Sequence, residues 1–149
     1  MAKTYHQGKY IPINPEKYIG NPNEIFYRSS WEKKLMLFFD KTPAILEWNS
    51  EETVIPYISP LDSRAHRYFT DFSVVYKTKT GEIKKAIVEV KPFKQTLPPE
   101  NKSRKTKQFI NEVSTYAVNQ AKWAAARDWC KKKGFEFMLI TEKELGIGK

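Results

Sequence analysis

The sequence predicts an α/β protein in which helices flank a central mixed β-sheet. Three observations support this prediction. Residues 67–76 and 82–91 are rich in β-branched and aromatic side chains, and a glycine-containing turn joins them, which indicates a hairpin. Apolar residues recur at three- and four-residue intervals from about 108 to 133, which indicates a long helix. The apolar run at 135–140 is typical of a last strand.

The first 27 residues are predicted to form an extended N-terminal arm, because three prolines and two glycines interrupt them. A helix is expected next, from Ser30 to Asp40. Ser29 stands three residues before Glu32, which is the spacing of a capping box, and apolar residues then follow at helical intervals. Glu32 therefore has a purely structural interpretation, as the capping partner of Ser29.

The segments on either side of the hairpin are less regular. Short strands are expected at 45–48 and 53–57, and Pro56 favours an edge position for the second. After the hairpin, residues 94–107 are polar and basic without an apolar period, which predicts a basic loop. Gly134 follows three lysines and marks the end of the long helix.

Size and charge limit the classes of function. A chain of 149 residues with 40% apolar residues is expected to form one domain, residues 1–149. Lys and Arg number 26 against 17 Asp and Glu, so the formal net charge is +9. This excess favours a polyanionic partner, because neutralising phosphates releases counterions. A soluble protein that is merely basic is the alternative.

Neither a membrane segment nor a disulfide is expected. No stretch is apolar enough to cross a bilayer, and the opening residues lack a signal peptide, so we expect a soluble protein that is not secreted by that route. Cys130 is the only cysteine, and His6 and His66 are the only histidines. These three residues are too few for a zinc site, and a single cysteine excludes an internal disulfide.

The predicted hairpin places two acids opposite each other. If its turn is centred on Thr80, residues whose numbers sum to 160 are paired, and Asp71 lies opposite Glu89. Two such carboxylates repel each other unless a divalent cation such as Mg²⁺ bridges them. Period-two alternation puts Lys91 on the same face as Glu89. The alternative is a solvated surface hairpin, since a turn of even length would break this register.

The residues around these positions resemble the PD-(D/E)xK nuclease superfamily. The matching stretches are 27–32, 66–72 and 88–92. The branch with the greatest likeness contains the Tn7-type transposon end-cleaving subunit and the head completion nucleases of T-even-type bacteriophages, which the arm and residues 119–123 also resemble. The superfamily's proline-aspartate pair is replaced here by Thr70 and Asp71.

The resemblance implies a restriction-endonuclease-like core and a specific active site. It makes Asp71, Glu89 and the backbone carbonyl of Val90 metal ligands, with Lys91 as the catalytic lysine. Glu32 completes the acidic set as a catalytic residue and an additional candidate ligand. The implied cofactor is Mg²⁺, for which Mn²⁺ is expected to substitute.

The implied activity is hydrolysis of phosphodiester bonds in double-stranded DNA with little sequence specificity, during the processing of DNA ends in head completion. Phage portal or neck proteins are candidate partners, and the expected location is the host cytoplasm or the virion. One alternative is a non-catalytic virion protein that binds DNA ends. A third possible function is cleavage that is specific for DNA junctions. The oligomeric state stays open.

Residues expected to contact DNA carry basic or polar side chains near these segments. They are Arg28, His66, Arg67, Lys94, Lys102, Arg104, Lys105, Lys107, Gln120 and Lys122. The alternatives are a solvated loop for His66 and Arg67, a solvated face for the lysine-rich loop, and a buried amide bonded to backbone for Gln120. Trp31 and Tyr68 are interpreted as core aromatics.

Overall fold

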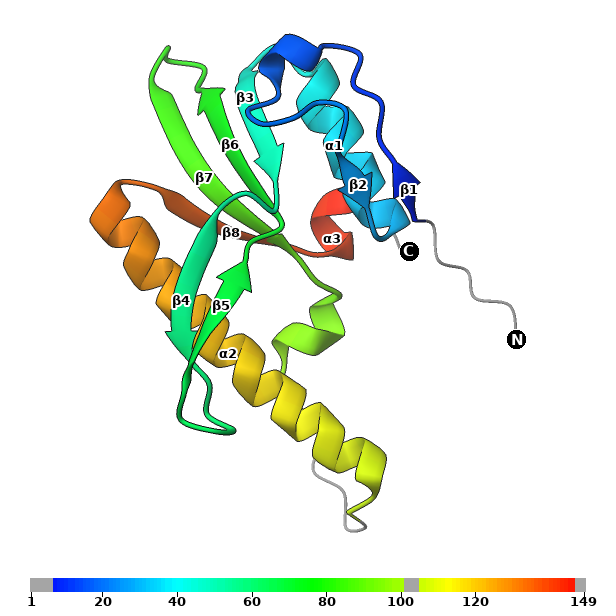
Figure 1. The fold of residues 1–149 in the computed structure, drawn as a ribbon, viewed down its shortest axis with the longest axis vertical. Coiled ribbons are helices and arrows are strands. Elements are labelled where there is room, and N and C mark those ends of the chain that lie inside the picture. Colours follow the sequence, from blue (N-terminus) through cyan, green and yellow to red (C-terminus); the bar gives the residue numbers. More distant parts are fainter. Residues whose placement is uncertain (1–6, 101–104, 147–149) are drawn as a thin grey trace.

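The computed structural model describes residues 7–100 and 105–146 and contains a four-stranded mixed sheet in the order β3–β6–β7–β8 (Figure 1). The strands are β3 (Ile45–Ser50), β6 (Phe72–Lys77), β7 (Ile83–Val90) and β8 (Glu136–Ile140). The first three are antiparallel, whereas β8 runs parallel to β7. Parallel neighbours need a crossover connection, and α2 (Lys107–Lys133) supplies it. The structure therefore confirms the predicted mixed sheet with its long helix.

The hairpin register agrees with the prediction from an odd-length turn. All paired residues from Phe72 and Val88 to Lys77 and Ile83 have numbers that sum to 160. The turn closes through hydrogen bonds from Thr78 N to Glu82 O and from Gly81 N to Thr78 O. The register holds as far as Phe72, the first residue of β6. It therefore also sets the position of the preceding residue, Asp71.

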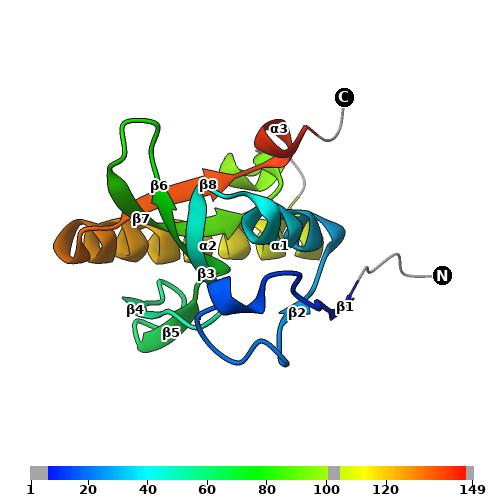
Figure 2. The same cartoon turned by 90° about the horizontal axis from the view of Figure 1, so that it is seen from above.

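The single strand predicted at 67–76 is wrong, because the chain breaks it into two strands in different sheets. The small hairpin of β4 (Val54–Ile58) and β5 (Ala65–Phe69) precedes β6. Figure 2 shows this hairpin standing to one side of the four-stranded sheet. Thr70 N donates to Thr53 O beside the small hairpin, whereas Asp71 O accepts from Glu51 N beside β3. The chain bends at this point because consecutive residues bond to different sheets.

Side chains from the two faces of the main sheet form two apolar clusters. On one face, α1 (Ser30–Lys41) covers Ala86 and Val88 of β7. On the other face, Ile55 and Tyr68 of the small hairpin pack with Trp123 of α2. Successive residues of a strand point to opposite faces, so Glu89 lies on the side opposite to Val88.

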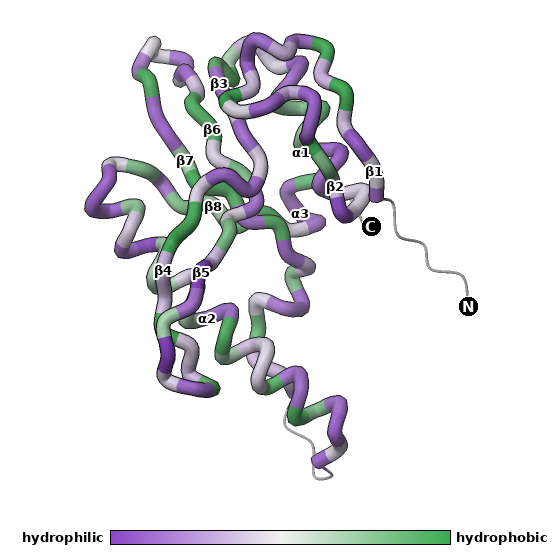
Figure 3. Tube along the Cα trace, in the orientation of Figure 1, coloured by the Kyte–Doolittle hydropathy of each residue, from purple (hydrophilic) through white to green (hydrophobic). Residues whose placement is uncertain are grey.

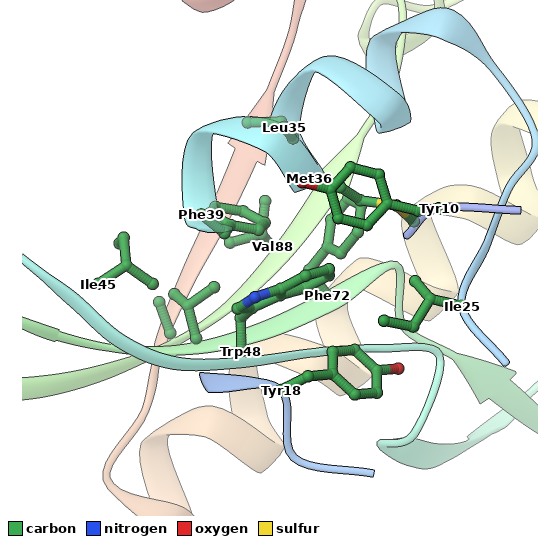
Figure 4. Packing of buried hydrophobic residues seen from close by; sticks show 12 residues of the cluster. Tyr10, Tyr18, Ile25, Leu35, Met36, Phe39, Ile45, Trp48, Phe72 and Val88 are labelled. Carbon is green, nitrogen blue, oxygen red and sulfur yellow. The ribbon is translucent and has the colours of Figure 1, made fainter. Parts of the chain in front are cut away.

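The first cluster is built around a buried tryptophan (Figure 4). Trp48 of β3 is 1% exposed, and its ring centroid lies 4.8 Å from that of Tyr18 and 5.8 Å from that of Phe39. Tyr10 adds an edge-on contact at 6.0 Å. Tyr10 and Tyr18 come from the N-terminal arm, so the arm completes the core. Residues 7–27 therefore pack against the rest of the domain.

The remaining elements are short. They are β1 (Gly8–Lys9), β2 (Phe26–Tyr27), α3 (Glu142–Leu145) and two 3-10 turns, η1 (Pro15–Lys17) and η2 (Phe93–Thr96). The described part of the arm, residues 7–27, thus has little regular structure. Within the described part of the chain, no helix combines the length and apolar character needed to cross a membrane.

Asp40, at the last turn of α1, holds the arm in place. Its carboxylate is fully buried and accepts hydrogen bonds from Tyr10 Oη at 2.6 Å, Ile13 N at 2.6 Å and Asn14 N at 2.9 Å. Lys17 Nζ donates to the Asp40 carbonyl at 3.0 Å. Burial alone would raise the pKa of the Asp40 carboxyl, but these hydrogen bonds outweigh burial and lower it.

Replacing Asp40 by asparagine is expected to lower the free energy of unfolding by about 2 kcal/mol at neutral pH, because the amide cannot accept all of these bonds. A carboxyl with a lowered pKa contributes stability above its ordinary value of 3.8, and this contribution is lost as the pH falls through the lower folded value. Urea unfolding at about pH 7 and about pH 3 should therefore show a difference that shrinks in acid. Asp128→Asn, at an exposed position, is the matched control. Equal stability of Asp40→Asn and the unaltered protein at neutral pH would contradict this role.

Candidate active site

The end of the hairpin brings Asp71 beside the strand that carries Glu89. Asp71 Oδ2 accepts a hydrogen bond of 2.8 Å from the backbone N–H of Val90. Glu89 is 4% exposed and pairs on its other side with Leu139 of β8. The structure thus brings together the two acids that the register predicted.

Two further side chains lie on the Glu89 carboxylate. Tyr68 Oη donates to Glu89 Oε1 at 2.5 Å, and Lys91 Nζ lies 3.9 Å from Glu89 Oε2. The Lys91 side chain is 29% exposed, so its amine is within reach of a ligand from solvent. Tyr68 is buried among apolar residues as predicted, but the sequence analysis missed its hydrogen bond. No local pattern reports it, because the bond joins two different sheets.

The acidic side chains of the site are held in an unfavourable electrostatic environment. Burial, followed by the charge of Glu89, raises the pKa of Asp71 well above its ordinary value. Burial also raises the pKa of Glu89, although the Tyr68 hydrogen bond and the Lys91 charge oppose the rise. Two close, buried carboxylates cost free energy when both are ionised, so this arrangement favours a bound proton or cation.

Glu32 lies at the N-terminus of α1, where Ser29 caps its backbone N–H but its carboxylate does not complete a capping box. Ser29 Oγ accepts from Glu32 N at 3.1 Å, as expected of a cap. The Glu32 carboxylate, however, accepts from Arg28 N at 2.9 Å, one residue earlier than a capping box would place it. Burial raises the pKa of Glu32, and its charge in turn raises the pKa of Asp71. The capping box between Ser29 and Glu32 is therefore not formed, and the Glu32 carboxylate lies near enough to the acid pair to act on it.

The donor set fits a hard divalent cation that keeps part of its water shell. Within residues 7–100 and 105–146, no three Asp, Glu, His or Cys side chains lie close enough to hold a metal by themselves. In the same part of the chain, Asp71 Oδ1 accepts no hydrogen bond and is available as a ligand. Mg²⁺ suits such a site, because it commonly takes one or two carboxylates and completes its shell with water and substrate phosphate.

Glu51 is a neighbour of the site that the sequence analysis missed. Its backbone N–H donates to Asp71 O at 3.1 Å, and its φ of 58° is rare for a residue other than glycine. Its carboxylate binds Arg28 Nη1 at 2.6 Å. This ion pair engages Arg28, one of the residues predicted to contact DNA, at the entrance to α1.

Lys122, another predicted DNA contact, is closely associated with the acid pair. Its Nζ lies 5.6 Å from the centroid of the Tyr68 ring, and its charge lowers the pKa of Glu89. The side chain of Gln120 is half-buried and makes no hydrogen bond to the described residues, so it is not a buried amide bonded to backbone. The adjacent Asn119 is the buried amide.

The other predicted contacts that the structure describes lie on exposed surfaces. His66 and Arg67 belong to β5, where they pair with Tyr57 and Pro56, so the alternative that they form a solvated loop is wrong. His66 Nε2 lies 2.9 Å from a carboxylate oxygen of Asp62. Three lysines of the predicted basic loop are exposed. Lys94 belongs to η2, Lys105 precedes α2, and Lys107 lies in the first turn of α2. Lys102 and Arg104 lie outside the described residues.

The fold and the acid pair define a class of protein. Residues 42–142 match the model of the TnsA-like endonuclease N-terminal domain, and the chain belongs to this family, whose fold is restriction-endonuclease-like. Over 144 residues the chain is 40% identical to the head completion nuclease of enterobacteria phage T4; the alignment covers 94% of this chain and 93% of that protein. No solved structure matches the chain significantly. These comparisons confirm the predicted fold class and the nuclease relationship.

Proposed function

We propose that this protein is a divalent-metal-dependent DNA endonuclease whose site consists of Glu32, Asp71, Glu89 and Lys91. The observation that carries the proposal is the buried pair Asp71 and Glu89, with the Lys91 amine 3.9 Å from the Glu89 carboxylate. The family's endonuclease description supports the same activity. A structural protein that binds DNA only through its charge has no need of two buried acids that repel each other.

Asp71, Glu89 and the Val90 carbonyl are the proposed ligands of Mg²⁺, with Glu32 as a further candidate. When bound, the metal supplies Lewis-acid stabilisation of charge on the phosphate and lowers the pKa of water. Each carboxylate is positioned by a hydrogen bond, Asp71 by Val90 N and Glu89 by the Tyr68 hydroxyl. Ligands fixed in this way lose little freedom when the metal binds.

Lys91 is proposed to act on the substrate rather than on the metal. Its ammonium group stands beside Glu89 and is partly exposed, so it can neutralise charge that develops on a scissile phosphate or orient the attacking water. Glu32 lies at the N-terminus of α1, and its charge acts on Asp71. A water molecule held between these groups would meet both an acceptor and a donor of protons.

The biological setting is proposed from the relative. The T4 protein is a head completion nuclease, and by that likeness we infer a role in head completion for this chain. The expected substrate is double-stranded DNA at packaged ends, cleaved with little sequence specificity. Portal or neck proteins are the candidate partners, and the host cytoplasm and the virion are the proposed locations.

The experiment is incubation of purified protein with supercoiled plasmid and Mg²⁺, Mn²⁺ or EDTA. We expect relaxed and linear DNA with either metal and none with EDTA. The double variant Asp71→Asn, Glu89→Gln, purified in parallel, controls for contaminating nuclease. Metal-independent cleavage, or equal cleavage by the double variant, would refute the assignment. If the protein binds the plasmid but does not cleave it with either metal, the result would favour the non-catalytic virion protein.

A further inference from the structure

The N-terminal half of α2 extends away from the main sheet. All four buried residues of this 27-residue helix lie at or after Asn119, so residues 107–118 have none. Figure 1 shows this half projecting below the sheet, beside the η2 segment, and Figure 3 shows hydrophobic and hydrophilic residues mixed along it. Tertiary packing usually supplies most of a helix's stability. This half therefore contributes little to the core.

A cavity of about 580 Å³ lies between this half of α2 and residues 94–100; we name it the α2 groove. Its volume is within the range of ligand sites. One wall is formed by Leu97, Pro98 and Pro99, and α2 contributes Asn111 and Tyr116 among other residues. The groove thus combines apolar surfaces suited to a flat ring with amide groups that can bond to its edge.

Asn119 is a second, independent indication of a ligand. It lines the groove, is only 5% exposed, and its side chain makes no hydrogen bond to the described residues. The unbonded amide atoms of Asn119 are not sealed from solvent, so they are open to the groove, where a ligand can replace water as their partner. A ligand in the groove that offers both a donor and an acceptor would satisfy it.

The charges of the groove favour a base over a phosphate. Its walls contain Lys94 but also Glu100 and Glu112, and Gln108 Nε2 lies 3.4 Å from Glu112 Oε2. Two carboxylates repel a phosphate, whereas a carboxylate or an amide accepts a hydrogen bond from the amino group of adenine or cytosine. Thymine carries no such amino group.

The groove ends close to the proposed active site. Asn119 and Lys122 are three residues apart on α2, so they share a helix face and differ by about 4.5 Å along its axis. Lys122 Nζ lies over the ring of Tyr68, whose hydroxyl binds Glu89. A base in the groove would therefore belong to a nucleotide near the bond to be cleaved.

We propose that the α2 groove binds one unstacked, amino-bearing nucleobase, so that the preferred substrate is DNA with a frayed or single-stranded end. This inference rests on the proposed nuclease function and specifies its substrate. A base inside a duplex is stacked between its neighbours, and it must leave the stack before a cavity can enclose it. Unpaired ends lower the cost of that step. Stacking on Tyr116 or the prolines and bonding to Asn119 then hold the base.

The test measures binding without cleavage. Fluorescence anisotropy in EDTA compares a fully paired duplex with duplexes that end in about four unpaired adenines or about four unpaired thymines. We expect the adenine-ended duplex to bind about tenfold more tightly than the other two. The variants Asn119→Ala and Asn111→Ala should lose this preference, while Ser114→Ala, on the same half of α2 but outside the groove, should keep it.

The outcomes separate this inference from the nuclease assignment, because EDTA removes cleavage from the measurement. Equal affinity for all three duplexes would overturn the proposal, and so would a preference that persists in both asparagine variants. Asn111 is exposed, so its replacement leaves the core intact and gives a valid result even if Asn119→Ala fails to fold. Cleavage that needs no metal would refute the nuclease mechanism and leave the binding result unaffected.

Discussion

Asp71→Asn is expected to lower the rate of metal-dependent DNA cleavage by about a thousandfold or more, while raising the thermal stability of the metal-free protein. The amide keeps the shape of the side chain and its capacity to accept from Val90 N, but it removes a negative ligand. A thousandfold loss corresponds to about 4 kcal/mol of transition-state stabilisation, which is reasonable for a metal ligand. Plasmid cleavage and calorimetric melting of the same preparation measure the two effects.

The stability gain should depend on pH in a defined direction. The pKa of Asp71 is raised above its ordinary value of 3.8. A carboxyl with a raised folded pKa contributes its stability below the ordinary value and loses it as the pH rises through the folded value. The advantage of Asp71→Asn without metal should therefore be larger at about pH 7.5 than at about pH 5. Glu142→Gln, at a carboxylate outside the acid pair, is the control. If Asp71→Asn melts no higher than the unaltered protein at either pH, the acid pair is not under electrostatic strain.

Lys91→Ala is expected to lower cleavage by about a hundredfold to a thousandfold without loss of metal binding. The amine stands beside Glu89 and reaches solvent, so its removal deprives the substrate phosphate of a positive charge and leaves the acid pair in place. Because Lys91 lowers the pKa of both Asp71 and Glu89, its loss should also shift the acidic limb of the pH–rate profile to higher pH.

Metal titration followed by melting temperature distinguishes this variant from Asp71→Asn. Mg²⁺ should stabilise Lys91→Ala as much as the unaltered protein, whereas Asp71→Asn should respond weakly. Lys91→Arg keeps the charge and should retain part of the activity. Full activity of Lys91→Ala would show that the amine has no part in the chemistry, and loss of its metal response would assign Lys91 a role in the metal site.

The hairpin register is predictable from the sequence, because a short turn fixes which residues of the two strands are opposite each other. This relation alone predicts that Asp71 and Glu89 are neighbours. The same reasoning failed at Thr70, where the chain changes sheets. The apolar and aromatic composition continues through the break, so no local signal marks it. The bend follows from hydrogen bonds to segments that are distant in the sequence.

Contacts between distant segments account for the other omissions. Tyr68 was recognised as a core residue because it is aromatic, but its bond to Glu89 depends on how the small hairpin sits against the main sheet. In the sequence, Asp40 has the pattern of an ordinary polar residue at the end of a helix. Its burial arises because the arm folds back and donates hydrogen bonds to its carboxylate. Glu32 was identified through a family resemblance, since a capping glutamate and an active-site glutamate have the same local pattern.

The parallel pairing of β8 with β7 has a consequence for biosynthesis. Lys91 N donates to Ile140 O, and Glu89 is flanked by Leu139, so the last strand supports the backbone of both site residues. A nascent chain that has not yet emerged beyond α2 lacks this support, and β7 is then an unprotected edge. The proposed catalytic centre is therefore completed only after the residues of β8, Glu136–Ile140, have been synthesised.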